Sequence, residues 1–101
     1  MTATVVLREA AQRDIELALD WYLAVAPEYA DRFLSDLDAT LRGVADAPRA
    51  YRSVYGHVRR AALRRFPYLV WFIYLDDTDS VVVLAVTHQR QDPKVVKTAA
   101  L

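Results

Sequence analysis

The stretch YLVWFIYLDDTDSVVVLAVT, residues 68–87, decides the fold. It holds two apolar runs rich in β-branched and aromatic residues, Tyr68 to Leu75 and Val81 to Thr87, joined by the polar segment Asp76 to Ser80. This composition predicts two long strands, and the short polar connection predicts a hairpin turn between them. Because both runs are apolar on both alternating faces, the strands are either covered on both sides or present one apolar face to a partner.

Shorter elements precede this hairpin in the chain. The segment Val58 to Leu63 predicts an arginine-flanked strand, whereas the proline, glycine and aperiodic tyrosines from Pro48 to His57 indicate a loop. At the amino end, a β-branched run within Ala3 to Arg8 predicts a further strand. The sheet therefore draws its strands from both ends of the chain.

Two amphipathic helices are predicted between the first strand and the loop. In the first, about Glu9 to Val25, apolar residues recur at three- and four-residue spacing. Trp21 lies at the edge of that face, where it either packs against the second helix or anchors a partner. Pro27 stops the first helix and suits the first position of the second, which runs to about Asp46 with Asp36 on its polar side. The apolar stripe of the second helix is Ala30, Phe33, Leu34, Leu37, Leu41 and Val44.

Length and composition bound the class of protein. A chain of 101 residues predicts one domain, residues 1–101, and the absence of cysteine suits a reducing compartment, the cytoplasm. Without cysteine there is no disulfide, thiolate metal site or cysteine nucleophile. The longest apolar run is less than half of what spans a bilayer, so no membrane segment is expected. The tail from about residue 94 has little to bury and is expected to be loosely held.

Charge is distributed unevenly although the net charge is zero. Met1 to Ala47 carries nine acids and four arginines, a net charge of −5, whereas Arg49 to Leu75 carries six arginines and no acid. Four of these arginines flank the short predicted strand, and alternation places Arg60 and Arg64 on one face, Arg59 and Arg65 on the other. They are either solvated charges that protect an edge strand, or a cationic surface for phosphates or an acidic segment.

The sequence offers few groups for catalysis. It has no glycine-rich phosphate loop, no histidine pair at metal-ligand spacing and no nucleophile elbow, so hydrolase and metalloenzyme chemistry, metals and cofactors are not expected. His88 closes the last predicted strand close to Arg90. Such a histidine either acts as a general acid near a stabilising cation or only hydrogen-bonds a neighbouring group.

The order of these segments resembles a known family. A strand, two helices, the segment Arg59 to Tyr68, an apolar hairpin and the string from His88 to Pro93 are similar to the ParE/RelE superfamily of toxins from bacterial type II toxin–antitoxin modules. The resemblance covers about Val5 to Val96. It implies an α+β fold of order β-α-α-β-β-β, with the helix hairpin packed on one face of an antiparallel sheet. It also implies an antitoxin partner in a hetero-oligomer.

Two branches of the superfamily act differently. RelE-like members cut mRNA in the ribosome and usually carry an arginine directly after the aromatic residue that follows the turn, where this chain has Leu69 after Tyr68. ParE-like members poison DNA gyrase without being nucleases, and the Phe66-Pro67-Tyr68 segment looks ParE-like. The resemblance therefore implies a gyrase inhibitor neutralised by a ParD-like antitoxin, with no catalytic residue.

Two alternatives remain at the level of sequence. In a RelE-like mRNA endonuclease, Arg60, Arg64 or Arg65 would stabilise phosphate charge and His88 would protonate the leaving oxygen. In a toxin-derived scaffold, antitoxin binding would be kept without toxicity. Acidic antitoxin side chains are expected to pair with some of the strand-flanking arginines. The candidates for contacting target or antitoxin are Arg59, Arg60, Arg64, Arg65, His88, Arg90 and Trp21.

Overall fold

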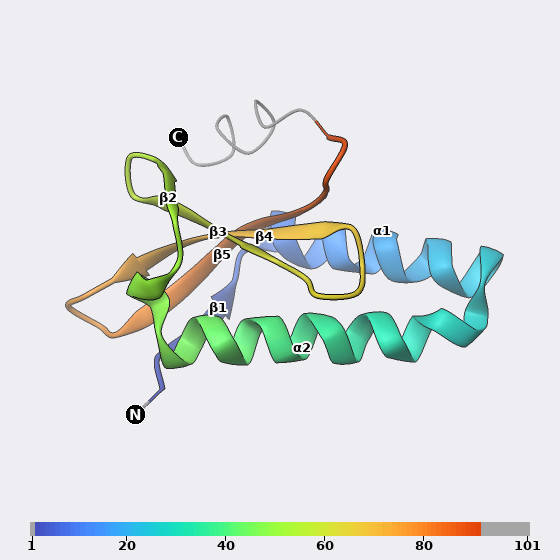
Figure 1. Cartoon of the computed structure of the whole chain (residues 1–101), viewed down its shortest axis with the longest axis horizontal. Coiled ribbons are helices and arrows are strands. Elements are labelled where there is room, and N and C mark those ends of the chain that lie inside the picture. Colours follow the sequence, from blue (N-terminus) through green and yellow to red (C-terminus); the bar gives the residue numbers. More distant parts are fainter. Residues whose placement is uncertain (1, 92–101) are drawn as a thin grey trace.

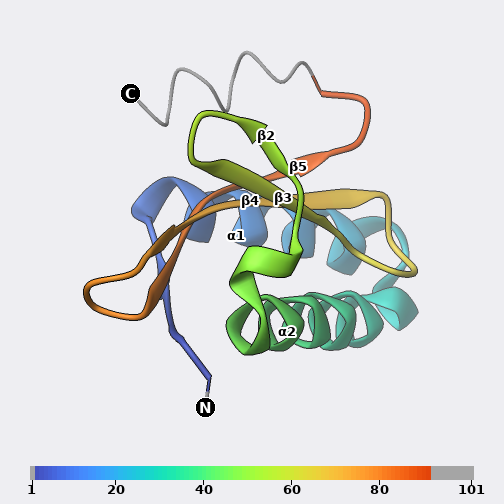
Figure 2. The ribbon, with the colours of Figure 1, turned by 60° about the vertical axis from the view of Figure 1, so that its left-hand side comes forward.

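The computed structural model describes residues 2–91 and places two helices against one face of a five-stranded sheet (Figures 1 and 2). The strands, in the spatial order β1-β5-β4-β3-β2, are β1 (Thr4–Leu7), β2 (Ser53–Tyr55), β3 (Val58–Ala62), β4 (Tyr68–Leu75) and β5 (Ser80–His88). The helices are α1 (Glu9–Val25) and α2 (Ala30–Asp46). The α+β fold with a helix hairpin on one face of the sheet is confirmed, while the expectation for the tail from about residue 94 lies outside the described residues.

Two local expectations are corrected. The second helix begins at Ala30, because Pro27–Tyr29 forms a separate 3₁₀ turn with the proline at its start. The segment predicted as a loop contains a 3₁₀ turn at Pro48–Ala50 and then β2. β2 has three residues and pairs irregularly with β3, and Gly56, at a φ of 55°, makes the turn between them. A strand this short carries no readable alternation.

The sheet is mixed, and the expected antiparallel sheet is wrong in this respect. β1 pairs in parallel with β5, from Thr4 opposite Ser80 to Leu7 opposite Val83, while the other pairings are antiparallel. Parallel strands need a long crossover connection, which the helices and the other strands supply here. The residue pattern of a four-residue strand does not record the direction of its neighbour.

The helix-facing core is centred on aromatic rings. Phe33 of α2 is fully buried, and its ring centroid lies 5.3 Å from that of Tyr22, 5.7 Å from that of Phe66 and 5.3 Å from that of Tyr68. These rings join both helices to the β3–β4 turn and to β4. Leu34, by contrast, is 38% exposed, so its place in the predicted apolar stripe is wrong.

The opposite face of the sheet also holds buried side chains. Trp71 is 1% exposed, its indole N–H donates to Thr87 Oγ1 at 2.8 Å, and the Tyr55 ring of β2 stacks against it with centroids 6.2 Å apart. A β-bulge inserts Leu84 into β5, since Trp71 pairs with Ala85 and Phe72 with Val83. The middle of each long strand is thus buried on both faces, while Leu69, Ile73 and Val82 on this second face are half-buried.

Gly43 near the end of α2 is expected to resist replacement. A Cβ atom there would lie 2.8 Å from the Tyr51 hydroxyl oxygen, and the Tyr51 ring is held against Phe72 with centroids 5.8 Å apart. Gly43→Ala, which usually stabilises a helix by about 1 kcal/mol, should therefore lower the free energy of unfolding. In a Tyr51→Phe background the same change should stabilise. Denaturant unfolding of the four proteins in this double-mutant cycle measures the coupling, and additive effects would contradict the contact.

Candidate functional site

The turn between β3 and β4 carries Arg64 and Arg65 outside any strand. β3 ends at Ala62, so the expected alternation of the arginines across two faces holds only for Arg59 and Arg60. The turn is fixed to α2 by Asp36, whose Oδ2 accepts the N–H of Arg65 at 2.8 Å and that of Phe66 at 3.2 Å. Asp36 is buried, so its predicted place on the polar side of α2 is wrong.

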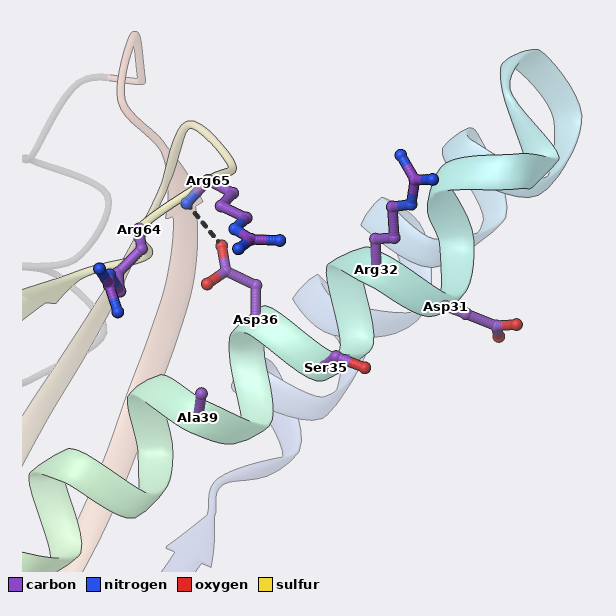
Figure 3. A pocket seen from close by; sticks show the side chains of 7 residues that line it. All are labelled: Asp31, Arg32, Ser35, Asp36, Ala39, Arg64 and Arg65. Carbon is purple, nitrogen blue, oxygen red and sulfur yellow. Dashed lines mark hydrogen bonds between the residues drawn. The ribbon is translucent and has the colours of Figure 1, made fainter.

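A depression of about 430 Å³ lies between α2 and this turn (Figure 3). We call it the α2 depression; it is lined by Asp31, Arg32, Ser35, Asp36, Ala39, Arg64 and Arg65. The α2 members recur at helical spacing along one face, and the turn supplies the remaining two arginines. Arg32 was not singled out by the sequence, because a lone arginine on a helix surface carries no signal of its own.

Arg59 and Arg60 lie in other environments. The half-buried Arg59 guanidinium donates to the carbonyl oxygen of Tyr51 at 2.6 Å and to that of Arg49 at 3.4 Å. Arg60 is exposed and lies over the Trp71 ring, 5.6 Å from its centroid, on the sheet face away from the helices. Arg59 therefore holds a loop, and the four arginines do not form one surface.

His88 and Trp21 lie together at a second hollow, beside α1. This α1 depression, about 250 Å³, is lined by Asp14, Leu17, Ala18, Trp21, Tyr68, Val86, His88 and Gln91. Trp21 is 55% exposed and Leu17 is 63% exposed, and the Trp21 ring packs edge-on against the Tyr22 ring with centroids 5.1 Å apart. Arg90 does not line this hollow.

The hydrogen bonds of His88 are local. Its Nδ1 accepts the N–H of Arg90 at 3.2 Å, and its own N–H donates to the Gln91 side-chain oxygen at 2.7 Å. The imidazole packs edge-on against the Tyr68 ring with centroids 5.3 Å apart. The Nδ1 atom of His88 is thus engaged by a neighbouring backbone group, and within residues 2–91 no group of histidine and acidic side chains is arranged to hold a metal.

Asp14 is a site residue that the sequence did not reveal. Its Oδ2 accepts the N–H of Val86 at 2.9 Å, tying α1 to β5. Burial raises the pKa of the Asp14 carboxyl above its ordinary value of 3.8, against the opposing effects of this hydrogen bond and of Arg13. An acid on a helix surface gives no sequence signal that it bonds a strand amide.

The raised pKa of Asp14 predicts a pH dependence of stability. The folded state binds the proton of the Asp14 carboxyl more tightly than the unfolded state does. The contribution of Asp14 to the free energy of unfolding should therefore fall as pH rises from 3.8 through the higher folded-state pKa. Asp14→Asn keeps an acceptor for Val86 and does not titrate. Urea unfolding at a series of pH values should show the wild-type advantage over Asp14→Asn shrinking as pH rises; an advantage that grows instead would contradict the burial effect.

The fold defines a class of small proteins. A chain of the chromosomal ParDE toxin–antitoxin system of P. aeruginosa superposes with a TM-score of 0.73 at 18% identity, covering 86% of this chain and 96% of that one. A free RelE toxin variant of E. coli gives a TM-score of 0.68 at 17% identity, over 99% and 95% of the two chains. Both show that the fold is that of ParE and RelE toxins.

Sequence comparison identifies the family. The chain matches the family described as "ParE toxin of type II toxin-antitoxin system, parDE" over residues 5–93. It is also 29% identical to Toxin ParE2 of Mycobacterium tuberculosis over 98 residues, which cover 96% of this chain and 91% of that protein. The chain therefore belongs to the ParE family of type II toxin–antitoxin toxins. Within residues 2–91, neither helix is long and apolar enough to cross a membrane.

Proposed function

We propose that this toxin inhibits DNA gyrase in the cytoplasm and is neutralised by a ParD-like antitoxin. Membership of the ParE family supports this proposal. The observation that carries it is the separation of His88 from Arg60, Arg64 and Arg65, the arginines of the nuclease alternative. His88 lines the α1 depression on the helix side of the sheet, while Arg60 lies over Trp71 on the other side.

Acid catalysis of phosphodiester cleavage needs a proton donor and a cation at one phosphate. Arg64 and Arg65 line the α2 depression, and no residue among those described lines both hollows. A general acid must lie within hydrogen-bond reach of the leaving oxygen, directly or through one water. The arrangement of His88 and these arginines therefore favours a protein that binds its target over one that cleaves RNA.

A supercoiling assay tests the proposal. Purified toxin added to gyrase, relaxed plasmid and ATP should slow supercoiling or accumulate cleaved DNA, and the ParD-like antitoxin should restore supercoiling. His88→Ala should not abolish the inhibition of gyrase, because no proton transfer by the imidazole is involved. Undisturbed supercoiling at excess toxin would reject gyrase as the target.

The alternative function is that of a ribosome-dependent mRNA endonuclease. The structural likeness to RelE is the reason to test it. Primer extension on translated mRNA should show no toxin-dependent cuts if the gyrase proposal is right. Cuts that disappear with His88→Ala would establish the nuclease instead.

A further inference from the structure

The α2 depression gathers three guanidinium groups from two elements. Arg32 rises from α2, one turn before Asp36, while Arg64 and Arg65 extend from the β3–β4 turn on either side of the Asp36 carboxylate (Figure 3). The Ala39 methyl group, one helical turn further along, leaves the hollow open. With three arginines against Asp31 and Asp36, the side chains that line the hollow carry a net charge of +1, which favours an anion.

Within residues 2–91 none of these three arginines forms an ion pair. The salt bridges of this part of the chain involve Arg13, Arg42 and Arg49. Neither acid lining the hollow forms a described ion pair with these arginines: Asp36 Oδ2 accepts two backbone N–H groups, and Asp31 points away from Arg64 and Arg65 (Figure 3). The guanidinium groups therefore keep hydrogen-bond donors for a ligand.

The hollow is also held in shape before a ligand arrives. The turn is fixed by the two hydrogen bonds to Asp36 and by the Phe66 ring, which packs on Phe33 with centroids 5.7 Å apart. The Arg32 guanidinium lies over the Tyr29 ring, 5.5 Å from its centroid. Binding groups that are already ordered lose less conformational entropy when a ligand binds.

We propose that Arg32, Arg64 and Arg65 bind a carboxylate side chain of an acidic peptide segment. The guanidinium fork matches a carboxylate through paired hydrogen bonds. A nucleic acid carries charge along its whole length, and beyond the hollow it would meet an amino-terminal segment, residues 1–47, with a net charge of −5. A short acidic peptide can place a carboxylate in the hollow without continuing across this acidic segment, whereas a longer nucleic acid continues across it.

We assign this carboxylate to the antitoxin, an assignment that rests on the proposed function. The inference sharpens the expectation from sequence, since Arg32 enters the set, Arg59 leaves it because it holds the loop carbonyls, and Arg60 leaves it because it lies on the opposite face. An acidic side chain seated between α2 and the turn would attach the partner to both elements at once.

A peptide titration tests the site without an antitoxin. Blocked hexaglutamate should shift the Nε–Hε resonances of Arg32, Arg64 and Arg65 in the full-length toxin, whereas hexaglutamine should not. Arg64→Gln with Arg65→Gln should weaken hexaglutamate binding at least about tenfold, because charge-assisted hydrogen bonds are lost. Arg42→Gln, on the same helix but paired with Asp38, is the matched control and should change binding less than about twofold.

Three results would overturn the carboxylate site: binding of hexaglutamine, an equal loss with Arg42→Gln, or tighter binding of a thymidine oligonucleotide of the same charge. The antitoxin is then titrated against wild type and the double variant at low salt, with circular dichroism to verify folding. Antitoxin binding to wild type that the double variant leaves unchanged would reject the site but not the proposed function. Failure of the antitoxin to bind wild type would reject the partner, while the peptide result still decides the site.

Discussion

Phe33→Ala is expected to lower the free energy of unfolding by about 3–5 kcal/mol, the largest effect predicted for this protein. Phe33 is fully buried and contacts the rings of Tyr22, Phe66 and Tyr68, which come from α1, the β3–β4 turn and β4. These three elements would have to move toward one another to fill the cavity that the substitution leaves. Urea unfolding followed by circular dichroism measures the loss.

Leu34→Ala is the matched control for this prediction. Leu34 follows Phe33 on the same helix and is 38% exposed, so its truncation should cost less than about 1 kcal/mol. Equal losses for the two variants would mean that Phe33 does not centre the core. Phe33→Leu should recover most of the lost stability, because it restores volume and leaves a smaller cavity.

Asp36→Ala should destabilise the protein by about 2–4 kcal/mol, because it leaves the N–H groups of Arg65 and Phe66 without their acceptor. It should also release the β3–β4 turn from α2. In this variant, the backbone amides of residues 65 and 66 should lose more protection from hydrogen exchange than the amides of β4 do. Global unfolding by denaturant measures the first effect, and exchange followed by NMR measures the second.

Asp38→Ala serves as the control for Asp36. Asp38 lies on the same helix and forms an exposed ion pair with Arg42 at 3.0 Å, which should contribute about 0.5 kcal/mol or less. Asp36→Asn should cost less than Asp36→Ala, because the amide oxygen still accepts a hydrogen bond. Unchanged protection of the turn amides in Asp36→Ala would show that the turn does not depend on α2.

Strong local patterns predicted most of the fold. The observed α1 and β4 have the predicted bounds, Glu9–Val25 and Tyr68–Leu75, because amphipathic spacing and a continuous β-branched and aromatic run each favour one structure. The direction of β1 and the existence of β2 were not predicted. Both depend on pairing with a distant or very short neighbour, which leaves no periodic trace in the sequence.

The candidate sites were predicted only in part. Arg64 and Arg65 were identified from the charge block, and Trp21 and His88 were identified singly without any sign that they share a hollow. Arg32 and Asp36 were missed as site residues, because their roles come from the packing of the β3–β4 turn on α2. Helical spacing reports which residues share a face, but it does not report what that face meets.

The inserted residue Leu84 has a consequence for chemistry at the end of β5. Before it, Val81 and Val83 face the helices; after it, Val86 does, so odd positions give way to even ones. His88 therefore falls on the helix side, opposite Tyr68. In a strand shorter by this one residue, the imidazole would project from the other face of the sheet, the one that carries Arg60. A single-residue deletion in β5 would therefore place His88 on the same face as Arg60.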